Sequence, residues 1–378
     1  MHESLLRVLV VDDTVTYRRI ISDALSGLPG IEVVGSAANG KIALEKIRHC
    51  RPDLLTLDVE MPEMDGLELL RRVNPAASGI GVIMLSVLPG EGARATLKAI
   101  ELGAFDFVVK PEGGDMRLSA DKLRRDLRLK LDAFTRSRQI RDILHGAREG
   151  RPPCSPVGNG GSRPVADFPG ACPNGARPHC GAAEPAVIAI GISTGGPQAL
   201  TRLVPQLPGD LAAPLLIVQH MPPVFTRSLA NDLNRRSALR VWEASDGQPI
   251  AAGNAYIAPG GKQMKIDNGD GTPVVRITDD LPENSCRPSV DYLFRSVAEI
   301  YGPRALGVIM TGMGNDGSRG MRQMHARGAS LLAQDQASCV VFGMPRESIE
   351  QGIAAAVPLD SMAAEIVRRV GKGLAACR

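Results

Sequence analysis

The feature that most constrains this chain is an alternation of short apolar segments with longer amphipathic ones. In its first third the apolar segments cover residues 6–11, 31–34, 54–57, 81–85 and 105–109. Each segment has the length of a buried strand, and each gap has room for a helix. Strands that are apolar on both faces and joined by helices are typical of parallel sheets covered on both sides. The pattern predicts a doubly wound, five-stranded α/β domain.

The same alternation resumes after residue 186. Its apolar segments cover residues 187–190, 214–218, 254–258, 274–277, 305–311 and 330–333. Aromatic residues make up only 3% of the chain, so both cores must be built from aliphatic side chains, which suits parallel sheets. We therefore predict a second doubly wound α/β domain.

Two different segments separate these domains. Residues 118–145 mix Arg, Lys, Asp and Leu at helical spacing, which predicts a last helix running into a charged linker. Residues 146–185 are rich in Gly, Pro, Ala and Ser, without hydrophobic periodicity, and are expected to form a tether. Cys172, His179 and Cys180 lack paired Cys-x-x-Cys spacing, which favours a linker over a zinc site. The predicted division is a first domain at residues 1–125, a linker at 126–185 and a second domain at 186–378.

Charge and cysteine content restrict the environment. The formal net charge of +3 is small for 378 residues, so no strong attraction to nucleic acid or anionic lipid is expected. The seven cysteines are an odd number scattered over the chain, which fits reduced thiols. No leader-like pattern and no apolar window of membrane-spanning length occurs. We expect a cytoplasmic protein with no direct membrane insertion.

Charged and polar residues follow the predicted strands of the first domain. Asp12 and Asp13 end the first strand, Asp58 the third, Ser86 the fourth and Lys110 the fifth. Carboxyl ends of parallel strands meet at one edge, so these side chains can share a site. Clustered carboxylates need a cation between them, and oxygen ligands suit Mg²⁺. Asp58 is then a candidate nucleophile for a phosphoryl group that Ser86 and Lys110 would contact. Each acid alone is better explained as a helix cap or loop residue; the combination favours a site.

The second domain contains a candidate serine hydrolase site. Gly191–Gly196 satisfies G-x-S-x-G between a strand and a helix, which places Ser193 on a tight turn. His220 ends the next apolar segment and is a candidate base, while Asp316 follows the segment 305–311 and is a candidate orienting acid. The motif alone is weak, because Gly-Ser turns also cap helices and hold phosphates.

An NAD site is a rival interpretation of the same domain. Gly312, Gly314 and Gly317 match G-x-G-x-x-G, and Asp335 follows about 20 residues later. The acid Asp316 inside that turn opposes phosphate binding. A serine hydrolase is therefore preferred to an NAD-binding oxidoreductase as the interpretation of this domain.

The first 115 residues resemble the response-regulator receiver family. The resemblance rests on the Asp12-Asp13 pair, on 57–62 followed by 64–66, and on Lys110-Pro111. It implies a flavodoxin-like fold, phosphorylation at Asp58 and a Mg²⁺ ion held by Asp12, Asp13, Asp58 and the backbone carbonyl of Glu60. Phe107 occupies the family's aromatic switch position.

Nearly all of the second domain resembles the protein-glutamate methylesterases of bacterial chemotaxis. The motifs are 191–196, 219–222 with 225–226, 287–291, 311–317, 334–338 and 343–345. The resemblance implies a Rossmann-like α/β fold, with Ser193 as nucleophile, His220 as base and Asp316 as orienting acid. It further implies that the Met313 amide stabilises the oxyanion and that Thr194 supports the site.

Together the two resemblances imply an activity and its partners. The activity is phosphorylation-controlled hydrolysis of glutamate γ-methyl esters on chemoreceptors, with glutamine deamidation in many relatives. A chemotaxis histidine kinase is the expected phosphodonor, and hydrolysis requires no cofactor. A DNA-binding response regulator is the alternative, but no helix-turn-helix region follows the linker. Cys286 stands where relatives often carry His, and the linker cysteines have no assigned family role.

Overall fold

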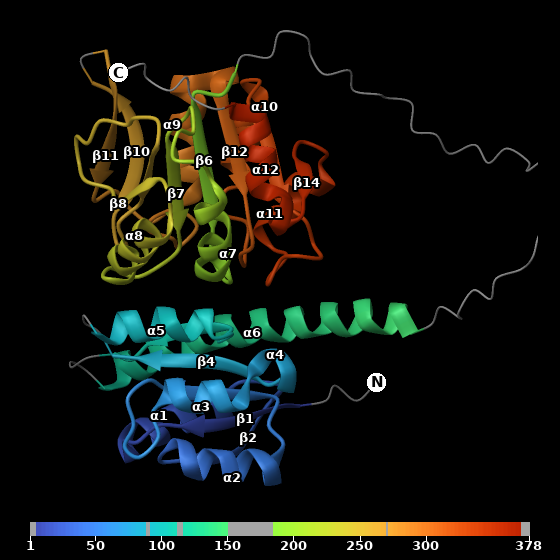
Figure 1. The fold of residues 1–378 in the computed structure, drawn as a ribbon. Coiled ribbons are helices and arrows are strands. Elements are labelled where there is room, and N and C mark those ends of the chain that lie inside the picture. The colour runs from blue at the N-terminus through green and yellow to red at the C-terminus, as the bar shows by residue number, and fades with distance from the viewer. Residues whose placement is uncertain (1–4, 88–90, 112–115, 150–183, 270, 372–378) are drawn as a thin grey trace, which may run out of the picture.

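The computed structural model describes residues 5–87, 91–111, 116–149, 184–269 and 271–371. Two α/β domains are stacked on each other, with helices α5 (Glu91–Glu101) and α6 (Met116–Glu149) between their sheets (Figure 1). The cysteines and histidine considered above as a zinc site lie outside the described residues.

The first domain is the predicted five-stranded sheet. Its strands are β1 (Leu6–Val11), β2 (Ile31–Ala37), β3 (Leu54–Asp58), β4 (Gly81–Ser86) and β5 (Asp106–Val109). The order is β2-β1-β3-β4-β5 and every pairing is parallel. The other helices of the domain are α1 (Val15–Ser26), α2 (Gly40–Cys50), α3 (Gly66–Val73) and α4 (Pro75–Ser78). This confirms the doubly wound parallel fold.

Helix α6 continues without a break for 34 residues. Leu127, Leu131 and Phe134 are buried in the core of the first domain, so helical periodicity persists well beyond residue 125. The ring of Phe134 packs against Gly81, where a β-carbon would lie 2.3 Å from a ring atom. A side chain at position 81 would therefore push α6 away from the sheet.

The second domain is built on a larger parallel sheet. Its strands are β6 (Val187–Ile192), β7 (Leu215–Gln219), β8 (Arg240–Glu243), β9 (Asn254–Ile257), β12 (Ala305–Ile309), β13 (Ser330–Gln334) and β14 (Ala355–Val357). The order is β14-β13-β12-β6-β7-β9-β8, with all pairings parallel. The α-helices are α7 (Gly196–Leu203), α8 (Phe225–Arg236), α9 (Val290–Tyr301), α10 (Ser318–Ala326), α11 (Met344–Glu350) and α12 (Leu359–Val370). The predicted fold class of this domain is confirmed as well.

One predicted strand lies outside the main sheet. Residues 274–277 belong to β11 (Pro273–Thr278), which pairs in antiparallel fashion with β10 (Gln263–Asn268). Only four residues join these strands, which suffices for a hairpin and is too short for the crossover that a parallel pair requires. The length of the connection thus determines that the pairing is antiparallel, which the hydrophobic pattern does not reveal.

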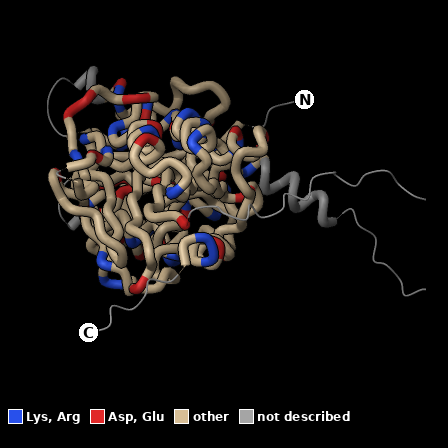
Figure 2. Tube along the Cα trace, turned by 90° about the horizontal axis from the view of Figure 1, so that it is seen from above, with Lys and Arg blue, Asp and Glu red and all other residues tan. Residues whose placement is uncertain are grey.

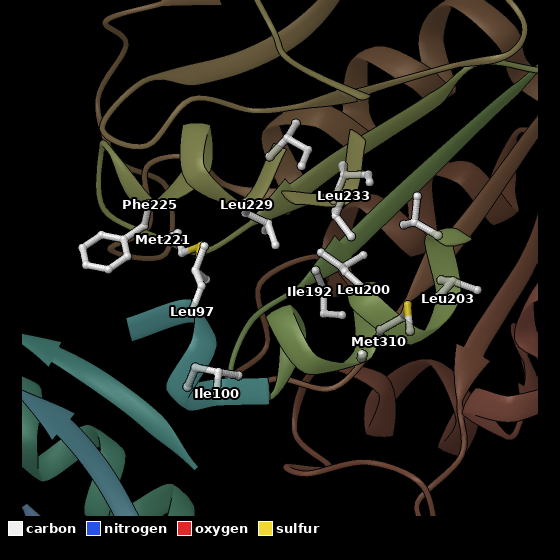
Figure 3. Close-up of a cluster of buried hydrophobic side chains, with 14 of the residues drawn as sticks. Leu97, Ile100, Ile192, Leu200, Leu203, Met221, Phe225, Leu229, Leu233 and Met310 are labelled. Carbon is white, nitrogen blue, oxygen red and sulfur yellow. The ribbon is translucent and has the colours of Figure 1, made fainter. Parts of the chain in front are cut away.

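The domains share a hydrophobic interface. Leu97 and Ile100 of α5 belong to the same buried cluster as Met221 and Phe225 of the second domain, and Figure 3 shows α5 approaching α8. At the edge of this contact, Glu101 of α5 forms an ion pair with Arg236 of α8. Burial of apolar side chains from both domains stabilises this closed arrangement.

Candidate active site and phospho-acceptor site

Three adjacent strands present the candidate hydrolase residues at one edge of the sheet. Strand β6 lies between β12 and β7, and Ser193, His220 and Asp316 all follow the carboxyl ends of these strands. Backbone hydrogen bonds tie the ends together: the Ser193 amide donates to Thr311 O at 2.9 Å, and the His220 amide donates to Ile192 O at 3.1 Å. Residues more than 120 positions apart therefore share one site.

Asp316 is the most firmly held of these side chains. Its Oδ2 lies 2.8 Å from Nε2 of His220 and accepts the Val290 amide at 2.7 Å. Its Oδ1 accepts from Asn284 Nδ2 and Ser289 Oγ, each at 2.8 Å. The Asp291 amide also donates to Oδ1, at 3.2 Å. A buried carboxylate with these five donors is fixed in orientation and remains charged.

The electrostatics of the pair follow from these contacts. Burial favours the neutral acid, yet the hydrogen bonds from His220, Val290 and Asn284 and the charge of His220 lower the pKa of Asp316. Burial likewise disfavours charge on the imidazole, but its hydrogen bonds with Asp316 and Cys286 raise the pKa of His220 to about 9. An imidazolium would thus be stabilised beside Asp316.

Ser193 and His220 open into one cavity of about 640 Å³. Among the described residues, Ser193 Oγ and the His220 ring form no hydrogen bond with each other. Nδ1 of His220 instead faces the thiol of Cys286, whose Sγ lies 3.8 Å away. The cavity places the candidate nucleophile and base together without a formed proton path between them.

The two supporting residues occupy different places. Thr194 is buried, and its carbonyl accepts a 3.0 Å hydrogen bond from Thr311 Oγ1, which fixes the turn after Ser193. Met313 lines a neighbouring cavity of about 470 Å³ together with Arg136 of α6. Buried Gln219, whose Nε2 donates to the Ser193 carbonyl at 3.0 Å, also holds this turn.

The first domain covers the cavity that holds Ser193. The same cavity is lined by Phe107 of β5 and by α6 residues that include Lys122, Asp126 and Leu129. Leu129 keeps about half of its surface exposed. In this arrangement a macromolecular substrate cannot approach Ser193 from the side occupied by α6.

The charged residues of the first domain form a second site. Asp12, Asp13 and Asp58 each offer a carboxylate oxygen, and these atoms lie within 4.8 Å of one another. Lys110 Nζ lies 2.5 Å from Asp58 Oδ2 and 2.7 Å from Asp12 Oδ2. Asp12 Oδ2 is buried and makes no well-aligned hydrogen bond despite that ion pair. Hard oxygen donors, one lacking a proper partner, fit Mg²⁺.

A cavity of about 190 Å³ opens onto this second site, lined by Asp58, Glu60, Ser86 and Lys110 among others. Burial raises the pKa of Asp58 to about 6 against the opposing effect of Lys110. A bound cation or phosphoryl group would change this balance, because both alter the charge beside the carboxylate. All of the predicted residues except the fully buried Asp12 thus line one small polar recess.

The loop before α9 contributes residues that the sequence did not reveal. Asn284 bridges Asp316 and Asp291 with hydrogen bonds of 2.8 Å each, and it adopts a φ of 50°. A single Asn in a loop has no recognisable spacing, so only the neighbouring segment 287–291 pointed to this region.

The geometry of the 312–317 turn argues against the NAD site considered above. The turn directs the carboxylate of Asp316 toward His220. That anion lies where the phosphate of a dinucleotide would bind.

Two surface properties accompany these sites. Lys and Arg are interspersed with Asp and Glu along the described trace (Figure 2), as expected from the small net charge. No helix in the described ranges combines the length and apolar character needed to cross a membrane.

Comparison with known proteins identifies both halves of the chain. Residues 188–366 match the CheB methylesterase family, and residues 8–120 match the response regulator receiver domain. A protein-glutamate methylesterase/protein-glutamine glutaminase of Desulfotalea psychrophila is 48% identical over 97% of this chain and 98% of its own length. One from a Nocardioides species is 42% identical over 97% and 96%.

A solved structure also aligns with this chain. The Thermotoga maritima CheB methylesterase catalytic domain is 38% identical, with a TM-score of 0.48, and the alignment covers 49% of this chain and 99% of that one. The full-length relatives carry the assignment and confirm the resemblance inferred from the motifs. The chain belongs to the family of protein-glutamate methylesterase/protein-glutamine glutaminases.

Proposed function

We propose that this protein hydrolyses glutamate γ-methyl esters on chemoreceptors and deamidates glutamine side chains at the same site. The observation that carries the proposal is the hydrogen-bonded pair of His220 and Asp316, which shares a sheet edge and a cavity rim with Ser193. An alcohol, an imidazole and a carboxylate are the groups that acyl transfer through a serine ester requires.

In the proposed reaction Ser193 Oγ attacks the ester carbonyl while His220 removes the hydroxyl proton. Asp316 holds the imidazole and stabilises its charged form, as a buried carboxylate with five donors is suited to do. The C–O bond to methanol breaks with return of that proton, and water then releases the glutamate carboxylate. The Met313 amide is assigned to the oxyanion, and Thr194 supports the turn.

Control by phosphorylation follows from the cover over the cavity. Asp58 is the proposed phospho-acceptor, with Lys110 and Ser86 on the phosphoryl oxygens. Asp12, Asp13, Asp58 and the Glu60 carbonyl would hold Mg²⁺, which would offset the phosphoryl charge when bound. Phosphorylation would shift the population toward an arrangement in which α6 and Phe107 no longer cover Ser193. The phosphodonor is proposed to be a chemotaxis histidine kinase.

The direct test is methanol release from methylated receptor by the full chain, with and without a small phosphodonor and Mg²⁺. We expect release that rises with the phosphodonor and does not rise in the Asp58→Asn variant. No methanol release in either state would reject the esterase assignment. Equal stimulation of wild type and Asp58→Asn would reject control through this aspartate.

A further inference from the structure

The thiol of Cys286 faces the imidazole on the side that Asp316 leaves open. Cys286 Sγ lies 3.8 Å from His220 Nδ1 and 3.4 Å from the carbonyl oxygen of Asn284. Cys286 is a free cysteine, partly exposed, and it lines the same cavity as Ser193 and His220. A soft sulfur ligand and a ring nitrogen therefore point into one solvent-accessible space.

The orientation of the imidazole is fixed from behind. Nε2 lies 2.8 Å from Asp316 Oδ2, and the carboxylate is held by Asn284, Ser289 and Val290. With the proton on Nε2, the lone pair on Nδ1 is directed to the thiol side. Histidines that bind metal ions usually donate their other ring N–H to a carboxylate in this way.

The separation of the two atoms matches what a metal ion requires. Zinc bonds of about 2.0–2.1 Å to nitrogen and about 2.3 Å to sulfur, at a tetrahedral angle, place the two ligand atoms roughly 3.6 Å apart. The observed 3.8 Å differs from this by a few tenths of an ångström. Ligand atoms of His220, Cys286 and Asp316 all lie within 4.8 Å of one another.

We propose that His220 Nδ1 and Cys286 Sγ form an inhibitory site for a thiophilic divalent cation such as Zn²⁺, with Asp316 as the carboxylate behind the histidine. The thiol loses its proton to solvent on binding, and water from the cavity completes the coordination. An ion on Nδ1 removes the lone pair that would accept the Ser193 proton. Inhibition rests on the proposed function, whereas binding does not.

The two candidate cation sites within the described residues differ in chemistry. The carboxylates of Asp12, Asp13 and Asp58 select hard cations, whereas a thiolate and an imidazole select Zn²⁺, Co²⁺ and related ions. Saturating Mg²⁺ therefore occupies the receiver without occupying the hydrolase site. Of these two sites, the one at Cys286 gives bound Co²⁺ a sulfur ligand and the carboxylate site does not.

The binding test uses the reduced, metal-free full chain with Mg²⁺ in excess and Co²⁺ as the probe. We expect a thiolate-to-cobalt absorption band in the near ultraviolet that saturates at one equivalent and is displaced by Zn²⁺. Cys286→Ser should lack the band, and Cys339→Ser, which changes a free thiol elsewhere in the domain, should keep it. A band that survives in Cys286→Ser would assign binding to other cysteines and overturn the site.

The inhibition test compares each variant with its own metal-free rate of methanol release. One equivalent of Zn²⁺ should slow the wild type at least tenfold and should not slow Cys286→Ser. Cys286→His replaces sulfur by nitrogen, so it should lose the cobalt band and retain inhibition; this second variant also serves if Cys286→Ser does not fold. Equal inhibition of wild type and Cys286→Ser would refute the mechanism. If the chain shows the Cys286-dependent cobalt band but no esterase activity, the proposed function is rejected and the metal site stands.

Discussion

The ring of Phe107 in β5 stacks on the ring of Phe225 at the start of α8, with centroids 4.4 Å apart and ring planes inclined by 27°. Phe107 also lines the cavity that contains Ser193. The stack therefore joins the receiver directly to the wall of the hydrolase site. Any movement of Phe107 that accompanies phosphorylation must break or remake this contact.

Weakening that stack should activate the unphosphorylated chain. Aromatic pairs contribute about 0.5–1.5 kcal/mol beyond their buried area, so Phe107→Leu should raise the basal esterase rate about two- to tenfold. Methanol release without phosphodonor measures the effect. The matched control is Phe105→Leu, because Phe105 contacts Phe134 edge to face inside the receiver. Equal activation by both changes would point to general loosening of the receiver.

Removing the candidate nucleophile should abolish the reaction. Ser193→Ala is expected to lower the esterase rate on the order of 10³-fold or more, because the variant lacks the hydroxyl that forms the serine ester. Phosphorylation of Asp58 should be unaffected, which a phosphate-release assay can establish. Ser361→Ala, at an exposed position of α12, is the control. Methanol release retained by Ser193→Ala would exclude a serine ester at this residue.

Neutralising the orienting acid should be nearly as severe. Asp316→Asn keeps the shape but loses the charge that stabilises the imidazolium, and a drop in kcat on the order of 10⁴-fold is expected. Asp360→Asn, at an exposed carboxylate, should leave the rate unchanged. Melting curves of both variants separate loss of catalysis from loss of fold. A drop of less than tenfold for Asp316→Asn would argue against its role.

The rate should depend on pH through His220. Its raised pKa of about 9 means that the neutral base is scarce at pH 7, so the rate of the chelator-treated enzyme should rise with pH up to about 9. Cys286→Ala removes one contact that raises the pKa of His220, so the rise of the rate should occur at lower pH in this variant. Charged His220 should also stabilise the folded state. This contribution to the free energy of unfolding is fully present below the unfolded pKa of about 6.5 and is lost as pH rises through 9. A rise of the rate at the same pH in wild type and Cys286→Ala would disprove the effect of Cys286 on the pKa of His220.

The sequence by itself determined the type of each domain. Apolar segments of strand length separated by helix-length gaps leave few alternatives to a parallel sheet, and β1, β3, β4 and β12 begin at the predicted residues. The motifs also named Ser193, His220 and Asp316 as candidates, because short motifs at strand ends are visible without knowing the strand order. The hairpin of β10 and β11 was not foreseen, since hydrophobicity does not reveal pairing direction.

Only the tertiary structure decided which of these residues meet. Strand β6 lies between β12 and β7, and this order cannot be read from the positions of the strands along the chain. The order brings Asp316 next to His220. Asn284 and Cys286 complete the surroundings of that pair from a loop without recognisable spacing. The cover formed by α6 and Phe107 depends on docking between domains. Local patterns reflect periodic burial along one segment, whereas sites and interfaces depend on contacts between distant segments.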